Sequence, residues 1–295
     1  MERKTIYALG FFDGVHLGHQ ALLRACRELA AETDCQAGVI TFTSHPDALV
    51  SGSAPGLINS IEDRRRLLAG LGMERIAALP FDEKMMRTSW QAFFQRLVEE
   101  FGAAGLVCGY DFRFGAQGAG NALRLEGACR EAGIPCRVVP EQRLDGVTVS
   151  STHIRKLLAA GDVAAAGKFL GHPHILSGQV TGGRHLGRRL GTPTANIPVP
   201  PGVLLPRYGV YACKARVADR VYMAVTNVGV RPTVEGRHAT VEPWLLDFSG
   251  DLYGKTLTLE FHGFIRPERW FGSLETLQAE IRKNADDTRN FFGKN

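Results

Sequence analysis

The sequence has no long hydrophobic run, because none of its apolar stretches approaches the roughly 20 residues that a membrane-spanning helix requires. We expect no secretory signal, because only five residues precede the apolar stretch at residues 6–9. With 295 residues, of which 44% are hydrophobic and 22% charged, the chain can form two globular domains. We therefore expect a cytoplasmic protein with no membrane partner.

Cysteine pairs of the metal-binding type and basic tracts with interleaved aromatic residues are also missing. The six cysteines form no C-x-x-C pair and no zinc-type spacing, and most lie in apolar stretches, which indicates small buried residues. The net charge of +5 comes without a run of lysine and arginine interleaved with aromatic residues, so we expect no nucleic-acid partner. An excess of this size also suits an enzyme that binds polyphosphates. The sequence leaves open whether the protein forms a homo-oligomer.

What the chain does contain is a turn rich in glycine and histidine at residues 10–19, GFFDGVHLGH. The apolar residues before it predict a strand, and apolar residues at helical spacing after it predict a helix over residues 20–31. The turn then lies at a helix N-terminus, where unpaired N–H groups and the helix dipole favour phosphate.

Two histidines of this turn are candidates for chemistry at phosphorus. If the helix begins within this turn, His16 and His19 share one of its faces, and Gly18 has no Cβ to keep a ligand from the backbone. Imidazoles at a phosphate site suit a reaction that builds up charge on phosphorus. The alternatives are a surface pair of histidines and a metal site, although no further metal ligands cluster nearby.

Strand and helix patterns alternate up to about residue 171. Strands are predicted at residues 6–9, 38–42, 75–80, 106–109 and 136–139, and helices at 20–31, 62–71, 90–101 and 125–132. This alternation predicts the α/β class with a doubly wound parallel sheet. Ligands of such sheets bind beyond the carboxyl ends of the strands. The glycine- and histidine-rich turn lies at one such end, and residues 109–115, GYDFRFG, lie at another.

A second anion site is predicted at residues 150–158, SSTHIRKLL. Its hydroxyl groups are good N-cap residues for a helix that ends near Gly161, and Arg155 adds a cation. An ordinary capped surface helix is the alternative. Two anion sites in one α/β domain indicate a nucleotide.

At residues 171–174 the pattern changes from alternating strands and helices to a series of strands, so we predict domains at 1–171 and 172–295. Strand-like stretches at 175–180, 208–217, 221–228 and 257–265, followed by a helix at 274–282, predict an antiparallel β-barrel closed by a terminal helix. Between the first strands, residues 187–197 present the Thr194 hydroxyl and the Asn196 amide together. Such oxygen ligands suit Mg²⁺ that bridges ATP phosphates, whereas a plain β-turn is the alternative.

With both halves considered, the chain resembles the prokaryotic bifunctional riboflavin kinase/FMN adenylyltransferase family, also called FAD synthetase, from about residue 8 to residue 292. In the N-terminal half the resemblance rests on residues 10–19, 41–42, 45–46, 109–115 and 150–155. In the C-terminal half it rests on residues 187–196, on the N-x-G-x-R-P-T loop at 227–233, on Glu242 with 245–254, and on 265–268 with Phe271.

The resemblance implies two domains and two reactions: a nucleotidyltransferase domain followed by a flavokinase barrel. In the C-terminal half, riboflavin and ATP give FMN and ADP, with Glu242 as the base for the ribityl hydroxyl and with Thr194 and Asn196 holding Mg²⁺ and ATP. In the N-terminal half, the FMN phosphate attacks the α-phosphorus of a second ATP, which gives FAD and pyrophosphate. His16 and His19 stabilise that transition state.

The same resemblance assigns further ligand-binding residues. Those expected to hold the ATP phosphates in the N-terminal half are Ser150, Ser151, Thr152 and Arg155. Others in that half are Gly10, Phe12, Asp13, Gly18 and Asp111. Those in the C-terminal half are Gly191, Asn227, Arg231, Thr233 and Arg266.

The chain departs from the family pattern at four positions: Phe11 replaces Asn or Val, Thr192 replaces Phe, Trp244 replaces His, and Asn284 replaces Asp. Each residue with a direct role is present, so we expect both sites to work. Two alternatives stay open. One is a nucleotidyltransferase for a pantetheine phosphate or nicotinamide mononucleotide with an unrelated β domain. The other is a flavin-binding or regulatory protein with one or both sites inactive.

Overall fold

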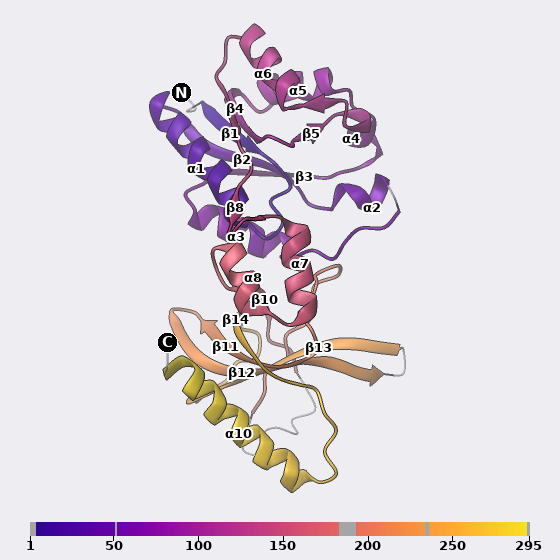
Figure 1. The fold of residues 1–295 in the computed structure, drawn as a ribbon, viewed down its shortest axis with the longest axis vertical. Coiled ribbons are helices and arrows are strands. Elements are labelled where there is room, and N and C mark those ends of the chain that lie inside the picture. The colour runs from indigo at the N-terminus through magenta and orange to yellow at the C-terminus, as the bar shows by residue number, and fades with distance from the viewer. Residues whose placement is uncertain (1–3, 51, 183–192, 234–235, 294–295) are drawn as a thin grey trace. The chain divides into compact units, whose positions relative to one another are not determined.

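The structure is a computed structural model that describes residues 4–50, 52–182, 193–233 and 236–293 (Figure 1). By spatial contacts the chain divides into two units, Met1–Leu57 with Arg64–Ser150 and Ile58–Asp63 with Ser151–Asn295. The boundary after residue 171 between the two functional domains stays a prediction.

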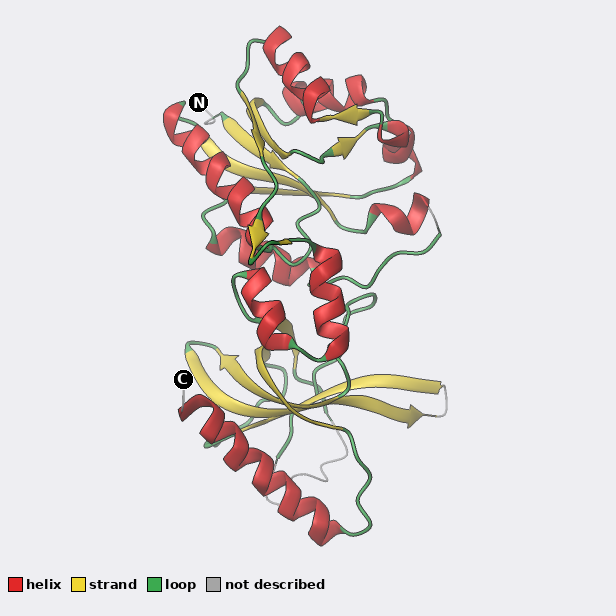
Figure 2. Ribbon diagram, viewed as in Figure 1, coloured by secondary structure: helices red, strands yellow, loops and turns green. Residues whose placement is uncertain are grey.

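The first unit contains a five-stranded sheet in the order β3-β2-β1-β4-β7. Figure 2 draws the strands in yellow and the helices in red. All four strand pairs are parallel, which confirms the predicted doubly wound sheet. The chain moves from β1 outward to β3 and then returns to β4 on the other side, so β1 and β4 flank the topological switch point. The strands are β1 (Thr5–Leu9), β2 (Gln36–Phe42), β3 (Arg75–Leu79), β4 (Ala103–Gly109) and β7 (Cys136–Val139).

Helices and one short hairpin connect these strands, and a second hairpin follows β7. The helices are α1 (Leu17–Glu32), α2 (Pro46–Val50), α3 (Ile61–Gly70), α4 (Glu83–Arg87), α5 (Trp90–Glu99) and α6 (Ala122–Glu131). The hairpins are β5 (Arg113–Phe114) with β6 (Gly120–Asn121) and β8 (Arg143–Leu144) with β9 (Val147–Thr148), and a short 3-10 helix η1 (Ala116–Gly118) lies between β5 and β6.

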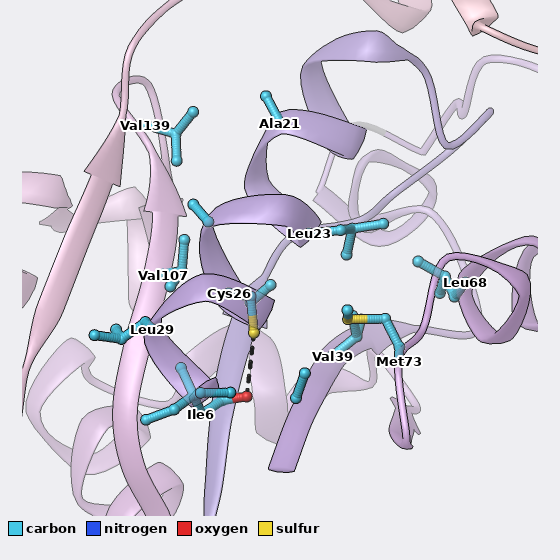
Figure 3. Close-up of a cluster of buried hydrophobic side chains, with 14 of the residues drawn as sticks. Ile6, Ala21, Leu23, Cys26, Leu29, Val39, Leu68, Met73, Val107 and Val139 are labelled. Atoms are coloured by element: carbon cyan, nitrogen blue, oxygen red, sulfur yellow. Dashed lines mark hydrogen bonds between the residues drawn. The ribbon is translucent and has the colours of Figure 1, made fainter. Parts of the chain in front are cut away.

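Strand β1 is buried on both faces, which explains its continuous apolar sequence. Because side chains alternate along a strand, Ile6 packs in one core cluster and Tyr7 in the other. In the first cluster, Cys26 and Leu29 of α1 lie beside Ile6, and the Cys26 thiol donates to the Ile6 carbonyl at 3.2 Å (Figure 3). This packing fixes α1 against β1 and therefore fixes the turn between them.

The second unit is built on an antiparallel sheet in the order β10-β14-β11-β12-β13. Its two edges are joined by a segment that bridges from Asn196 to Thr181, after β10, and from Ile197 to Val241 in β13. The N–H groups of Thr181 and Ile197 make the corresponding hydrogen bonds, each 3.0 Å long. These bridges link the two sides of the sheet, and the antiparallel sheet with its terminal helix confirms the predicted second domain as a half-barrel. The strands are β10 (His174–Gln179), β11 (Gly209–Val217), β12 (Arg220–Thr233), β13 (Gly236–Leu245) and β14 (Thr256–Pro267).

Among its described residues, the second unit contains α7 (Ser151–Ala160), α8 (Val163–Leu170) and the terminal α10 (Leu274–Gly293). Helix α10 packs its Ala285 against Val210 and Val225 on the outer face of the sheet. None of the helices in the described ranges is long and apolar enough to cross a membrane.

Several elements differ from the sequence-based expectation. Residues 227–233 belong to strand β12, so the expected loop there is wrong, and strand β13 had no counterpart in the prediction. Pro243 and Glu242 interrupt the apolar pattern of β13, and proline is rare inside strands. Helices α2, α4 and α8 were not expected, and α10 runs eleven residues beyond the predicted end at residue 282, to Gly293.

Candidate active sites

The turn after β1 has an unusual backbone. Phe12 and Val15 have φ angles of 57° and 43°, and Gly14 has 82°. The left-handed region is costly for a β-branched residue such as Val15, and strain of this kind clusters at functional sites. The Phe12 side chain is fully buried, with its ring centroid 5.1 Å from that of His19. A Cβ on Gly10 would meet this ring at 3.1 Å, so glycine makes room for it.

The two histidines form a stacked pair at the start of α1. His16 is the N-cap residue, and its Nδ1 accepts a hydrogen bond from the backbone N–H of His19 at 3.3 Å. The two ring centroids lie 3.6 Å apart with 14° between the planes. A Cβ on Gly18 would meet the His16 ring at 3.1 Å, so glycine at this position makes the stack possible. The sequence predicted the shared face, and the structure adds the ring contact.

The electrostatic setting of His19 favours a neutral imidazole. Burial holds the pKa of His19 well below its usual range, and the charges of His16 and Arg64 lower it further. The His19 Nδ1 atom is buried and has no hydrogen-bond partner among the described residues. This ring can therefore accept or donate one hydrogen bond at neutral pH.

Sequence reasoning missed a buried arginine beside this turn. Arg64 of α3 is 0% exposed, and its Nη1 donates to the carbonyl oxygens of Phe11 at 3.0 Å and Phe42 at 2.9 Å. Its Nη2 lies 3.9 Å from Oδ1 of Asp13, which is itself 2% exposed. Burial lowers the pKa of Arg64, and the charge of Asp13 opposes that shift. No sequence signal singles it out, because Arg64 stands first in a run of three arginines.

The unusual Phe11 packs within this group. The Arg64 guanidinium lies 4.2 Å from the centroid of the Phe11 ring, and the ring of His45 meets Phe11 edge-on at 4.7 Å. Its aromatic side chain therefore has defined partners.

The other glycine-rich stretch of the first unit emerges at the same edge of the sheet. The parallel register pairs Ala8 of β1 with Val107 of β4, so residue 10 and the residues after Gly109 follow neighbouring strand ends. Asp111 lies two residues beyond the end of β4, where it is exposed. Its Oδ1 lies 3.1 Å from the position that a Cβ on Gly109 would occupy, so the carboxylate folds back over that glycine.

The predicted second anion site begins helix α7. Ser150 is the last residue of the first unit, whereas Ser151, Thr152 and Arg155 belong to the second. Buried Ile154 anchors the helix, and the Arg155 side chain is half-buried.

In the barrel, register brings three predicted polar residues into one row. Asn227 of β12 pairs directly with Glu242 of β13. On the other side of β13, the N–H groups that flank Asn196 donate to the carbonyls that flank Glu242, at 2.9 and 3.0 Å, so these two residues are also opposite. All three are half-buried, whereas their strand neighbours are buried: Ala195, Ile197, Thr226, Val228, Val241 and Pro243. The row therefore lies on the outer face of the barrel.

Neighbouring groups complete this face. Trp244, two residues after Glu242, joins the cluster under α10, and Thr194 lies exposed two residues before Asn196. A Cβ on Gly229 would overlap the Glu268 carboxylate, so the segment after β14 packs onto β12 close to Asn227. The row is thus bordered by α10 and by this segment.

Arg266 ties β14 to α10. Its Nε lies 3.0 Å from Glu280 Oε1 and donates to Asn284 Oδ1 at 3.2 Å. Burial lowers the pKa of Arg266, and the Glu280 charge opposes this. Asn284, which departs from the family pattern, is 2% exposed and accepts this bond without adding charge.

Four positions named from the sequence are not fully described. Gly191 and Thr192 lie outside the described residues, and for Arg231 and Thr233 only the backbone is described. The backbone of the last two continues β12. Among the described residues, no group of three or more His, Cys, Asp or Glu side chains is arranged to hold a metal ion.

Comparisons with known proteins match both halves of the chain. The FAD synthetase family model matches residues 1–153, and the riboflavin kinase model matches residues 170–292. Relatives from Listeria monocytogenes and Pseudomonas fluorescens, both described as bifunctional riboflavin kinase/FMN adenylyltransferase, are 33% identical over 292 residues and 38% identical over 287. These alignments cover 98% and 96% of this chain, and 93% and 91% of the relatives. The chain belongs to the bifunctional riboflavin kinase/FMN adenylyltransferase family.

The family assignment excludes a nucleotidyltransferase with an unrelated β domain, because the riboflavin kinase model matches the β domain of this chain. A solved structure from Streptococcus pneumoniae, described as a macrolide-efflux protein, has a TM-score of 0.88 and 30% identity, and covers 98% of this chain and 95% of its own. Its description names transport, whereas both family models and the curated relatives name flavin enzymes.

Proposed function

We propose that the chain makes FAD from riboflavin in two steps, one in each half. Residues 170–292 phosphorylate riboflavin with ATP to give FMN and ADP. Residues 1–153 then join FMN to the adenylyl group of a second ATP and release pyrophosphate. The observation that carries the proposal is the presence of both family models, in this order, in a chain that aligns over nearly its full length with bifunctional relatives.

In the adenylyl transfer, a phosphate oxygen of FMN forms a bond to the α-phosphorus of ATP while the bond from that phosphorus to the bridging oxygen breaks. Negative charge builds up at the transferring group and at pyrophosphate. The N-terminus of α1 presents backbone N–H groups and the positive end of the helix dipole there. Since Nδ1 of His16 accepts a hydrogen bond, a neutral His16 carries its proton on Nε2 and can donate it to a phosphate oxygen. Neutral His19 supplies a second donor without repelling a protonated neighbour.

In the kinase step, Glu242 accepts the proton of the ribityl hydroxyl as its oxygen attacks the γ-phosphorus, and ADP leaves. Asn196 and Asn227 lie on either side of Glu242 in the row and can orient the hydroxyl and the phosphates. The Thr194 hydroxyl and the Asn196 carbonyl oxygen are hard donors that fit Mg²⁺. When bound, this ion would neutralise charge on the ATP phosphates.

The other residue assignments stay predictions. For ATP phosphates in the adenylyl step they are Ser150, Ser151, Thr152 and Arg155, and for other ligand contacts Gly10, Phe12, Asp13, Gly18, Asp111, Gly191, Arg231, Thr233 and Arg266. The cytoplasm, where ATP is made and used, is the proposed compartment. A homo-oligomer also stays a proposal.

Two matched variants separate the half-reactions. We expect Glu242→Gln to lower the rate of FMN formation from riboflavin by a factor of about 10² to 10⁴, because general-base catalysis contributes that much. FAD formation from added FMN should stay unchanged. His19→Gln should show the converse pattern. If either variant lowers both activities equally, the assignment of the two steps to separate residues is wrong.

A further inference from the structure

Arg64 is a buried cation beside the proposed adenylyl-transfer turn. It is 0% exposed, and its Nε and Nη2 atoms have no hydrogen-bond partner among the described residues. Removing a guanidinium from water is costly unless the surrounding structure compensates for the loss of hydration. A cation that is retained under these conditions calls for a role that an apolar residue could not fill.

Arg64 contacts the turn at Phe11 and Asp13 and also contacts the end of β2. Nη1 joins the carbonyl of Phe11, in the turn, to the carbonyl of Phe42, at the end of β2. The Thr41 hydroxyl donates to the same Phe11 carbonyl at 2.8 Å, so this oxygen is held from two sides. The guanidinium also covers the Phe11 ring and faces Asp13. Residues 11 and 13 flank the strained Phe12 and come shortly before His16.

The charge of Arg64 also acts on the second histidine. His19 stacks on the His16 ring and lies against the Phe12 ring, and the charge of Arg64 contributes to the lowered pKa of His19. Asp13 faces Arg64 and partly balances its charge. A proton on His19 would place a further positive charge against Arg64 and against any proton on His16.

We propose that Arg64 is a positioning residue for adenylyl transfer, which holds the 11–13 turn and thereby the histidine pair, and disfavours a positive charge on His19. The proposal rests on the proposed adenylyltransferase function of this half. Arg64 acts through Phe11, Asp13 and His19 and contacts no reacting atom itself.

The test compares Arg64→Met, Arg64→Lys and a matched control, Arg65→Met, at the exposed neighbouring position of the same helix. Each full-length variant is assayed for FAD formation from FMN and for FMN formation from riboflavin. Because a displacement of about 1 Å at a reacting group costs up to about 100-fold, we expect Arg64→Met to lower kcat for FAD formation by about 10- to 100-fold. The kinase activity of the same sample should be unchanged, and Arg65→Met should match the wild type.

A pH profile separates positioning from a purely structural role. Loss of the Arg64 charge should raise the pKa of His19, since a neighbouring cation no longer opposes protonation. The imidazole signals of His19 in an NMR titration should therefore move to a higher midpoint in Arg64→Met. Arg64→Lys keeps the charge, so its His19 midpoint should stay close to that of the wild type. Its kcat should still fall, because the shorter lysine side chain lacks the planar guanidinium that covers the Phe11 ring while Nη1 holds the two carbonyls.

Three results would overturn the inference: wild-type kcat in Arg64→Met, wild-type kcat in Arg64→Lys, or an unchanged His19 midpoint in a folded Arg64→Met. If Arg64→Met does not fold, the kcat of Arg64→Lys decides alone. A wild-type protein that makes no FAD from FMN would instead reject the proposed function, whereas an active wild type with an equally active Arg64→Met rejects only the role of Arg64.

Discussion

The barrel unit should lose stability in mild acid because of one buried histidine. His174 of β10 is 0% exposed, packs against the Phe261 ring with centroids 5.4 Å apart, and has no hydrogen-bond partner for either ring nitrogen among the described residues. Burial lowers the pKa of His174 to about 3, and the charge of His172 contributes to this shift. The folded unit therefore holds a neutral ring under conditions in which the unfolded chain takes up a proton.

The sign and size of the effect follow from this pKa difference. The unfolded state binds more protons than the folded state below pH 6.5, so stability is complete above that pH and falls as the pH drops towards 3. With the folded pKa at about 3, the loss is about 2 kcal/mol at pH 5 and about 5 kcal/mol at the acid limit. For a unit of this size, 2 kcal/mol lowers Tm by about 4–8 °C.

Differential scanning calorimetry of the full chain at pH 7 and pH 5 tests this prediction. His174→Leu removes the titrating ring and should abolish this part of the Tm decrease. His172→Leu, a control at a half-buried position two residues earlier, should retain most of it. The reasoning fails if the barrel transition of His174→Leu moves between the two pH values by as much as that of the wild type.

Two further substitutions test contacts in the separate sites. Gly18→Ala places a Cβ 3.1 Å from the His16 ring, so it should disturb the histidine stack. The rate of FAD formation from FMN should fall, while the rate of FMN formation from riboflavin stays unchanged. Equal rates of FAD formation in variant and wild type would contradict the importance of the stack. Asn284→Ala removes the acceptor for Arg266 Nε and should destabilise the barrel unit by about 1–3 kcal/mol, seen as a lower Tm of that unit in calorimetry. An unchanged barrel transition would show that Glu280 alone suffices for Arg266.

The sequence predicted the parts of the fold that local patterns specify. The apolar run of β1, the glycines after it and the helical spacing of α1 lie within one short stretch, so the turn and its histidine pair could be anticipated. Strand β13 could not be predicted, because Glu242 and Pro243 break its apolar alternation. Asn196, which lies opposite Glu242, is also 46 residues earlier in the chain. The row of polar residues on the barrel exists only through strand register.

Arg64 shows a second kind of limit. It stands in a run of three arginines that suggests a solvated helix face, and Arg65 and Arg66 are exposed as that pattern indicates. Only tertiary packing against Phe11 and Asp13 distinguishes the first arginine from the other two. Burial of a single charged residue in a charged run is therefore a property of the fold.

The most direct test of the central claim follows the atoms of ATP into the flavins. Purified protein is incubated with riboflavin, Mg²⁺ and ATP labelled at either the α- or the γ-phosphorus, and the flavins are separated by chromatography over time. The account predicts that γ-label enters FMN first and then FAD, and that α-label enters FAD alone. Absence of labelled FMN and FAD from riboflavin, together with no FAD from supplied FMN, would contradict it.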